Sequence, residues 1–198
     1  MTIPQTLLQL AGADLTPAKI RDASLVLIDL QNEYLAGPIA VTQPEAAIAE
    51  AARLLAAARE AGAPVFHIAH RGRSGGLFDR DAERGQIVSA LAPLPGEAVV
   101  EKGLPNSFAS TDLHQRLTET GRKKLILAGF MTHMCVSSTA RAALDLGYAT
   151  TVVATACATR DLPNGSGGHI AATVIHDVAL VELSDRFAVI ARGAAEVL

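Results

Sequence analysis

The stretch Leu125-Ile126-Leu127-Ala128-Gly129-Phe130-Met131-Thr132-His133-Met134-Cys135 decides the fold of this chain. Its first four residues are all apolar, which is typical of a short strand that is buried on both faces of a parallel sheet. Gly129 marks a turn, and the small and apolar residues from Thr132 onward predict a helix that ends at Gly147. The sequence therefore predicts a strand, a tight turn and a helix start that carries Cys135.

Cys135 lies in the first turn of this predicted helix, at the carboxyl end of the predicted strand. Free N–H groups and the positive end of a helix favour a thiolate at such a position. A thiolate is the nucleophile that covalent acyl transfer requires. The alternative is a buried cysteine that acts as a small hydrophobic residue, and the local sequence leaves both interpretations open.

Composition limits the possible classes of protein. The 198 residues suit a single domain, and 49% hydrophobic against 19% charged residues argues against disorder. A formal net charge of −3 gives no basic footprint for nucleic acid, and no apolar run reaches membrane-spanning length. Residues 1–5 lack a basic region followed by an apolar one, so no secretion signal is expected. Two cysteines are too few for a disulfide framework, and we expect a reduced, cytoplasmic protein.

Strands and helices alternate along the rest of the chain. Apolar strands are predicted at residues 24–28 and 64–69, on either side of an Ala-rich helix that starts at Pro44 and ends near Ala61. Further strands are predicted at residues 98–101, 150–154 and 187–190, and further helices at residues 112–120 and after the Gly-Ser segment 163–168, ending near residue 179. This alternation predicts an α/β fold, namely one doubly wound domain over residues 1–198 with a six-stranded parallel sheet and helices on both faces.

The polar, Gly-rich residues 70–84 fit no regular element, and we expect a long functional loop there. Reactive side chains follow three of the predicted strands: Asp29, Lys102 and Cys135. The carboxyl ends of parallel strands form one edge, where α/β sheets bind ligands. Acyl chemistry at a cysteine needs a base that moves the thiol proton and a nearby cation. These three residues supply those parts.

The sequence motifs around these residues resemble those of the isochorismatase-like cysteine hydrolases. The similar segments are Asp29-Leu30-Gln31, Glu101-Lys102-Gly103 followed by Ser107-Phe108, and Gly129-Phe130-Met131-Thr132-His133-Met134-Cys135-Val136, and the resemblance covers about residues 25–190. It implies that Asp29 is the general base and acid, Lys102 the electrostatic support, and Cys135 a nucleophile that forms a thioester.

The resemblance carries further implications. It implies a cis peptide bond at Phe130–Met131, with the backbone N–H groups of Met131 and Cys135 forming an oxyanion hole. It also implies a homo-oligomer, either a dimer or a tetramer, that acts on a small molecule without a cofactor. Neither nucleic acid nor a membrane is expected as a partner.

One departure from the family concerns metals. The nicotinamidases of this superfamily carry Asp-x-His after the second strand, whereas this chain has His67-Ile68-Ala69-His70 there. Two histidines three apart on a strand are a poor metal pair, so we expect no metal and interpret His67 as a core residue. The retained Cys135 favours C–N cleavage of an amide, carbamoyl or ureido compound. The alternatives are a vinyl-ether hydrolase of isochorismatase type, with Asp29 as acid, and a non-catalytic binding protein.

Candidate substrate contacts are Gln31, Tyr34, His70, Arg71 and Phe108. For Tyr34 and Phe108, an apolar pocket wall and ordinary packing are equally open interpretations. Arg71 and the neighbouring Arg73 suit a substrate carboxylate, but equally a solvated lid or a contact with another subunit. His133 is a possible base for Cys135 because it lies two residues before it. On a helix, however, an offset of two residues directs the two side chains apart. Cys157 has no recognisable partner and is interpreted as structural.

Overall fold

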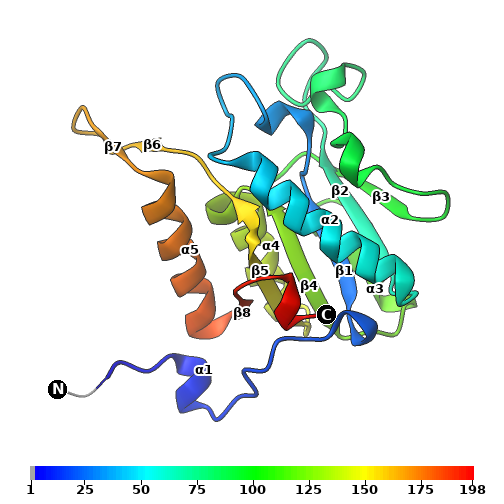
Figure 1. The fold of residues 1–198 in the computed structure, drawn as a ribbon, viewed down its shortest axis with the longest axis vertical. Coiled ribbons are helices and arrows are strands. Elements are labelled where there is room, and N and C mark those ends of the chain that lie inside the picture. The colour runs from blue at the N-terminus through cyan, green and yellow to red at the C-terminus, as the bar shows by residue number, and fades with distance from the viewer. Residues whose placement is uncertain (1–2) are drawn as a thin grey trace.

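The computed structural model describes residues 3–198; Met1 and Thr2, which begin the segment considered for a secretion signal, lie outside the described residues. Six parallel strands form one sheet in the order β3-β2-β1-β4-β5-β8 (Figure 1). The strands are β1 (Ser24–Ile28), β2 (Val65–His70), β3 (Ala98–Lys102), β4 (Lys124–Phe130), β5 (Ala149–Ala158) and β8 (Val189–Ala191). The predicted six-stranded parallel sheet is confirmed.

The helices cover both faces of this sheet. They are α1 (Leu7–Leu10), α2 (Pro44–Glu60), α3 (Leu113–Glu119), α4 (Ser137–Asp145) and α5 (Ala172–Arg186). In Figure 1, α2 lies in front of the sheet and α4 behind it, while a small hairpin of β6 (Leu162–Pro163) and β7 (His169–Ile170) projects beyond α5. The doubly wound arrangement predicted from the alternation is therefore also confirmed.

Alternate residues of each strand supply two separate cores. Leu25 and Leu27 of β1 pack with Leu54 of α2 on one face, whereas Val26 and Ile28 pack on the other face. Successive strand residues point to opposite faces, so a strand covered on both sides is apolar throughout. This is why the apolar runs predicted the strands so well.

The order of the strands reverses between β1 and β4, the two central strands. In doubly wound folds, ligands bind at such a reversal, outside the carboxyl ends of the strands. Asp29 follows β1 directly, and Cys135 lies five residues after Phe130, where β4 ends. The topology therefore places these two candidate residues beside the same crevice.

Several predicted boundaries differ from the structure. β5 continues to Ala158 and α5 to Arg186, both beyond their predicted ends, and β8 starts two residues later than predicted. The end of β5, Ala154-Thr155-Ala156-Cys157-Ala158, is rich in small residues that do not signal a strand. On α5, the exposed Val174 and Val178 blur the helical pattern. The hairpin of β6 and β7 was missed because its strands have two residues each.

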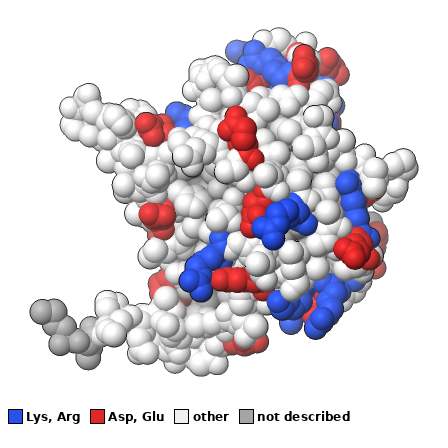
Figure 2. Space-filling model, in the orientation of Figure 1, with Lys and Arg blue, Asp and Glu red and all other residues white. Residues whose placement is uncertain are grey.

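The surface has no dominant charge on the face shown in Figure 2, where basic and acidic side chains are interspersed. Within residues 3–198, no helix combines the length and the apolarity needed to cross a bilayer.

Candidate active site

The side chains of Asp29, Lys102 and Cys135 meet at the carboxyl edge of the sheet. Lys102 Nζ lies 2.7 Å from Asp29 Oδ2 and 3.4 Å from Cys135 Sγ. The side chains of Asp29 and Lys102 are both fully buried, and Cys135 is 3% exposed. Lys102 reaches this group from β3, across the intervening strand β2, because its long side chain spans the gap. The structure thus brings together the three residues that the sequence selected.

The buried setting determines the protonation of the thiol and the carboxyl group. Burial raises the pKa of Asp29, although the Lys102 ammonium works in the opposite direction. Burial, followed by the neighbouring Asp29 carboxylate, raises the pKa of the Cys135 thiol to about 12. Desolvation therefore works against the thiolate that the sequence predicts, whereas the Lys102 ammonium favours it. The Asp29 carboxyl group lies within the same buried group, as a proton acceptor for the thiol would have to.

The turn between β4 and α4 has an unusual backbone. The Phe130–Met131 peptide bond is cis, at the position that the resemblance implies. Residues Thr132–Val136 form a single π-helical turn, a feature that is often found at functional sites. The Met131 carbonyl accepts the N–H groups of Met134 and Val136, which lie on either side of Cys135. The Met131 N–H itself has no acceptor among residues 3–198.

Two hydrogen bonds hold this turn from neighbouring elements. Thr132 Oγ1 lies 2.9 Å from His176 Nδ1 of α5, and His133 Nδ1 lies 2.6 Å from Thr159 Oγ1, just after β5. The His133 ring is therefore engaged by Thr159 rather than by the thiol of Cys135. This agrees with the interpretation that His133 is not the base.

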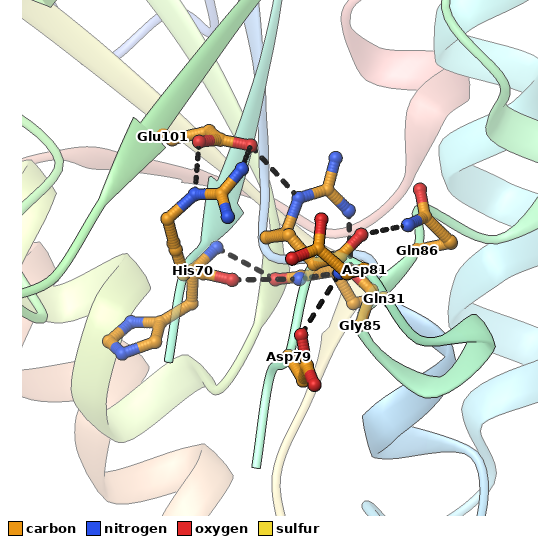
Figure 3. Close-up of polar contacts among 9 residues, drawn as sticks. Gln31, His70, Asp79, Asp81, Gly85, Gln86 and Glu101 are labelled. Atoms are coloured by element: carbon orange, nitrogen blue, oxygen red, sulfur yellow. Dashed lines mark hydrogen bonds and ion pairs between the residues drawn. The ribbon is translucent and has the colours of Figure 1, made fainter. Parts of the chain in front are cut away.

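Gln31 is fully buried and has no polar atom left for a substrate. Its Nε2 donates to the His70 carbonyl at 3.0 Å and to the Gly85 carbonyl at 2.7 Å. Its Oε1 accepts the His70 N–H at 2.8 Å, as Figure 3 shows. The assignment of Gln31 to substrate binding was wrong, because its amide instead fastens the loop after β2 to the end of β1.

Arg71 also lies outside the site. Its guanidinium makes a two-pronged ion pair with Glu101, which also accepts a hydrogen bond from Arg80 (Figure 3). Glu101 and Lys102 are successive strand residues and point to opposite faces, so Arg71 follows Glu101 away from the buried ammonium of Lys102. This geometry favours the solvated position of Arg71 over a substrate contact. Arg73 is exposed in the same loop.

For Phe108, the contacts favour ordinary packing over a pocket wall. Its ring stacks on Tyr148, with centroids 6.0 Å apart and an interplanar angle of 12°. Tyr148 directly precedes β5 and therefore lies at the amino edge of the sheet, opposite the carboxyl edge where Cys135 lies. Phe108 belongs to the core beside α3.

Tyr34 and His70 do lie near the three central side chains. His70 Nδ1 is 3.4 Å from Lys102 Nζ. Burial, then the nearby Asp29 carboxylate, raises the pKa of the Tyr34 hydroxyl. The rings of Tyr34 and His70 both contact Phe78, with centroids 5.2 Å and 4.9 Å away. Phe78 was missed because it lies in a loop whose conformation the sequence does not give.

Arg160 was also missed. It lies two residues after Ala158, where β5 ends, and its charge lowers the pKa of both Tyr34 and His133. Its Nε is buried without a hydrogen-bond partner among residues 3–198, and its Nη1 reaches only the Asp161 carbonyl, at 3.3 Å. The rule that selected Asp29, a charged residue at the carboxyl end of a strand, applies to Arg160 as well. An uncommitted guanidinium near the site is suited to an anionic group.

The two histidines of β2, His67 and His70, make separate contacts. His67 is 1% exposed, and its Nε2 lies 2.9 Å from Glu97 Oε2, beside Arg59. The interpretation of His67 as a satisfied core residue is confirmed. Within residues 3–198, no three His, Cys, Asp or Glu side chains form a cluster that could hold a metal ion.

The chain is similar to known proteins in both sequence and structure. The family model described as "Isochorismatase domain" matches residues 23–195. An isochorismatase from Pseudomonas putida KT2440 has a crystal structure with a TM-score of 0.94 and 46% sequence identity, covering 98% of this chain and 99% of that one. The fold of this chain is thus that of solved isochorismatase structures.

Curated relatives extend the comparison. The isochorismatase family protein YddQ of Bacillus subtilis is 44% identical over 142 residues, which is 70% of this chain and 79% of YddQ. The secreted isochorismatase effector Isc1 of Verticillium dahliae is 37% identical over 177 residues, covering 89% of this chain and 90% of Isc1. Maleamate amidohydrolase of Pseudomonas putida is 31% identical over 150 residues, covering 67% of this chain and 70% of that enzyme. Amidohydrolases therefore occur among the relatives.

Proposed function

This chain belongs to the isochorismatase family of hydrolases, and we propose that it cleaves the C–N bond of a small amide, carbamoyl or ureido compound through a thioester on Cys135. The observation that carries this proposal is the contact of the Lys102 ammonium with both the Asp29 carboxylate and the Cys135 sulfur, at 2.7 Å and 3.4 Å. A vinyl-ether hydrolase needs an acid but no nucleophile, whereas C–N cleavage uses all three groups.

In the first half of the proposed reaction, Asp29 takes the thiol proton and the Cys135 sulfur attacks the substrate carbonyl carbon. The carbonyl oxygen becomes an oxyanion, which accepts hydrogen bonds from the N–H groups of Met131 and Cys135. The Met131 N–H, for which residues 3–198 provide no acceptor, supports this role. Asp29 then gives its proton to the substrate nitrogen, the C–N bond breaks, and ammonia or an amine leaves a thioester behind.

In the second half, Asp29 removes a proton from water as the water oxygen attacks the thioester carbon. The same oxyanion hole binds the new tetrahedral intermediate. The C–S bond then breaks, the proton on Asp29 returns to the Cys135 sulfur, and the carboxylic acid is released. The ammonium of Lys102 remains charged throughout and balances the negative charge that moves between Asp29 and Cys135.

We further propose that the reaction needs no metal. The donor set supports this, because His67 is bonded to Glu97 and His70 faces the ammonium of Lys102, which repels a cation. The positive charge that a metal supplies elsewhere is supplied here by Lys102. Activity should therefore survive exhaustive chelation and dialysis, with no stoichiometric zinc or iron in elemental analysis; loss of activity that zinc restores would contradict this.

The substrate is proposed to carry a carboxylate besides its amide. The guanidinium of Arg160 supports this, because it is half-buried near Tyr34 and makes no ion pair within residues 3–198. The similarity to maleamate amidohydrolase, whose substrate name denotes an amide with a carboxylate, points in the same direction. A small acid amide would extend from Cys135 to Arg160.

A panel of small amides and ureides, assayed for release of ammonia, tests the function directly. Cys135→Ala should reduce turnover at least about 1,000-fold, because neither Asp29 nor Lys102 can replace the nucleophile. Cys157→Ala is the matched control: this cysteine is also buried, and its replacement should retain most activity. Comparable turnover by Cys135→Ala would contradict the thioester.

One observation favours a second candidate function. The raised pKa of Asp29 also suits a proton donor, as vinyl-ether hydrolysis of isochorismatase type requires. Cys135 would then be a bystander. If Cys135→Ala hydrolyses a vinyl ether while Asp29→Asn does not, this candidate replaces the first.

A further inference from the structure

The loop of residues 71–88 is fastened to the segment directly after β1. Gln31 Nε2 donates to the Gly85 carbonyl at 2.7 Å, and Asn32 Nδ2 donates to the Glu83 carbonyl at 2.9 Å. These donors come from consecutive residues. The far end of the loop is therefore fixed relative to the strand end that carries the catalytic carboxylate.

Glu33, the next residue, holds the middle of the same loop. Its side chain is 3% exposed, and Oε2 accepts the Phe78 N–H at 2.8 Å. Both oxygens also accept hydrogen bonds from Arg84, at 2.7 Å and 2.8 Å. Burial alone would raise the pKa of Glu33, but these hydrogen bonds lower it below its ordinary value. A charged, buried carboxylate thus holds the backbone of Phe78.

Phe78 is restrained on both sides of its own α-carbon. Its N–H is held by Glu33, and its carbonyl accepts the Gly72 N–H at 2.9 Å. Its φ of +57° is rare for a bulky residue, so the surrounding contacts have to maintain it. The side chain is only partly buried and keeps an accessible face.

The ring of Phe78 lies against two residues that border the buried group of Asp29, Lys102 and Cys135. It contacts the rings of His70 and Tyr34, at centroid distances of 4.9 Å and 5.2 Å. His70 in turn touches the ammonium of Lys102, at 3.4 Å. A group attached to the carbonyl that Cys135 attacks would therefore meet these three rings. Aromatic faces pack best against flat, conjugated groups.

We propose that Phe78 is the specificity-determining wall of the active site, that Glu33 is the positioning residue that holds it, and that the wall selects substrates whose carbonyl carries a planar, unsaturated group. This rests on the proposed amide hydrolase function for its substrate class. The hold of Glu33 on Phe78 is independent of the reaction and is measured separately.

The hydrogen bond between the Phe78 N–H and Glu33 is tested by amide hydrogen exchange of the loop, measured on the whole protein. In Glu33→Gln, the Phe78 amide should exchange roughly tenfold faster than in the wild type, since the charge-assisted hydrogen bond weakens by about 1.4 kcal/mol. Glu83→Gln is the matched control, because Glu83 is an exposed acid of the same loop. Equal protection of Phe78 in all three proteins would overturn the assignment of Glu33.

The selectivity is tested with matched pairs of amides, namely maleamate with succinamate and benzamide with cyclohexanecarboxamide. The wild type should prefer the planar member of each pair. Phe78→Ala should lower the ratio of kcat/KM values about tenfold, mostly through KM, whereas Phe78→Tyr should restore it. Glu33→Gln should shift the ratio in the same direction, and Glu83→Gln should leave it unchanged.

If Phe78→Ala keeps the preference for planar substrates, the assignment of Phe78 as the specificity-determining wall is overturned. Absence of turnover in the wild type with every compound would instead contradict the proposed amide hydrolysis, and the exchange measurement would still decide the role of Glu33. Failure of the inference and failure of the function are thus distinguishable.

Discussion

Lys102 Nζ lies 2.7 Å from Asp29 Oδ2 in a pair whose side chains are both fully buried. The other carboxylate oxygen, Asp29 Oδ1, has no hydrogen-bond partner among residues 3–198. A buried polar atom without a partner is costly and calls for an explanation. We infer that Oδ1 is the atom that exchanges protons with Cys135, while Oδ2 is held by the ammonium.

The ion pair should dominate stability at this edge of the sheet. Lys102→Met leaves a buried carboxylate alone, so the free energy of unfolding should fall by about 3–5 kcal/mol in urea titrations. The double variant Lys102→Met/Asp29→Leu should lose less than the two single variants together, because no unpaired charge remains. Lys124→Met, at the exposed start of β4, is the control and should change by less than about 0.5 kcal/mol. Additive losses in the double variant would contradict the pairing.

The pH dependence of activity should reveal the raised pKa of Asp29. The base must be ionised, so kcat/KM should fall on acidification at a pH above 3.8, the ordinary value for an aspartate. Since the folded state holds this proton more tightly than the unfolded chain does, Asp29 stabilises the fold below that value and loses this contribution as the pH rises. A pH profile of kcat/KM for an amide substrate provides the measurement. An acid limb below 3.8 would contradict the buried base.

Glu97 should make the fold less stable as the pH falls, which is the opposite of the effect expected from Asp29. Its hydrogen bond to Arg59, above all, lowers its pKa from 4.5 to about 2. The unfolded chain therefore takes up the proton first as the pH falls, and stability present above pH 4.5 should be lost progressively toward pH 2. Urea unfolding at several acidic pH values should show a shallower decline in Glu97→Gln than in the wild type. Glu60→Gln, at the exposed end of α2, should leave the decline as it is.

Arg160 should determine the preference for acid substrates. Arg160→Gln should raise KM for an anionic amide roughly 10- to 100-fold, the range expected for losing hydrogen bonds between charged groups. A neutral amide of similar size should be turned over with nearly unchanged kcat/KM. Arg73→Gln, which removes an exposed arginine of the loop after β2, is the control. An equal loss for both substrate types would show that Arg160 acts on the fold instead.

The sequence predicted the parts of the site that depend on strand ends. Asp29, Lys102 and Cys135 follow apolar runs, and parallel strands bring their carboxyl ends to one edge. It could not predict the contacts of Gln31, because these join it to His70 and Gly85 in a loop whose path no periodic pattern specifies. For the same reason it missed Phe78, which lies in the same loop and contacts Tyr34 and His70.

The protonation of Cys135 was the other point that the sequence could not give. Its position at a helix start suggested a thiolate, but the pKa depends on burial and on the distance to Asp29, which only the folded chain determines.

The cytoplasmic location and the homo-oligomeric state stay predictions. An apolar stripe of Val174, Val178 and Val181 is exposed on α5.

Gly129 determines how closely β4 approaches β1 beside the candidate active site. It pairs with Ile28 across the two central strands, and a Cβ on it would lie 2.0 Å from the Ile28 carbonyl oxygen. Its φ of +134° is open to glycine almost alone. β4, which leads to Cys135, can therefore lie against β1, which leads to Asp29, only because Gly129 has a hydrogen where other residues have a Cβ. A larger residue at this position would move Asp29 and Cys135 apart, so Gly129 sets the distance for the proposed proton transfer without itself taking part in it.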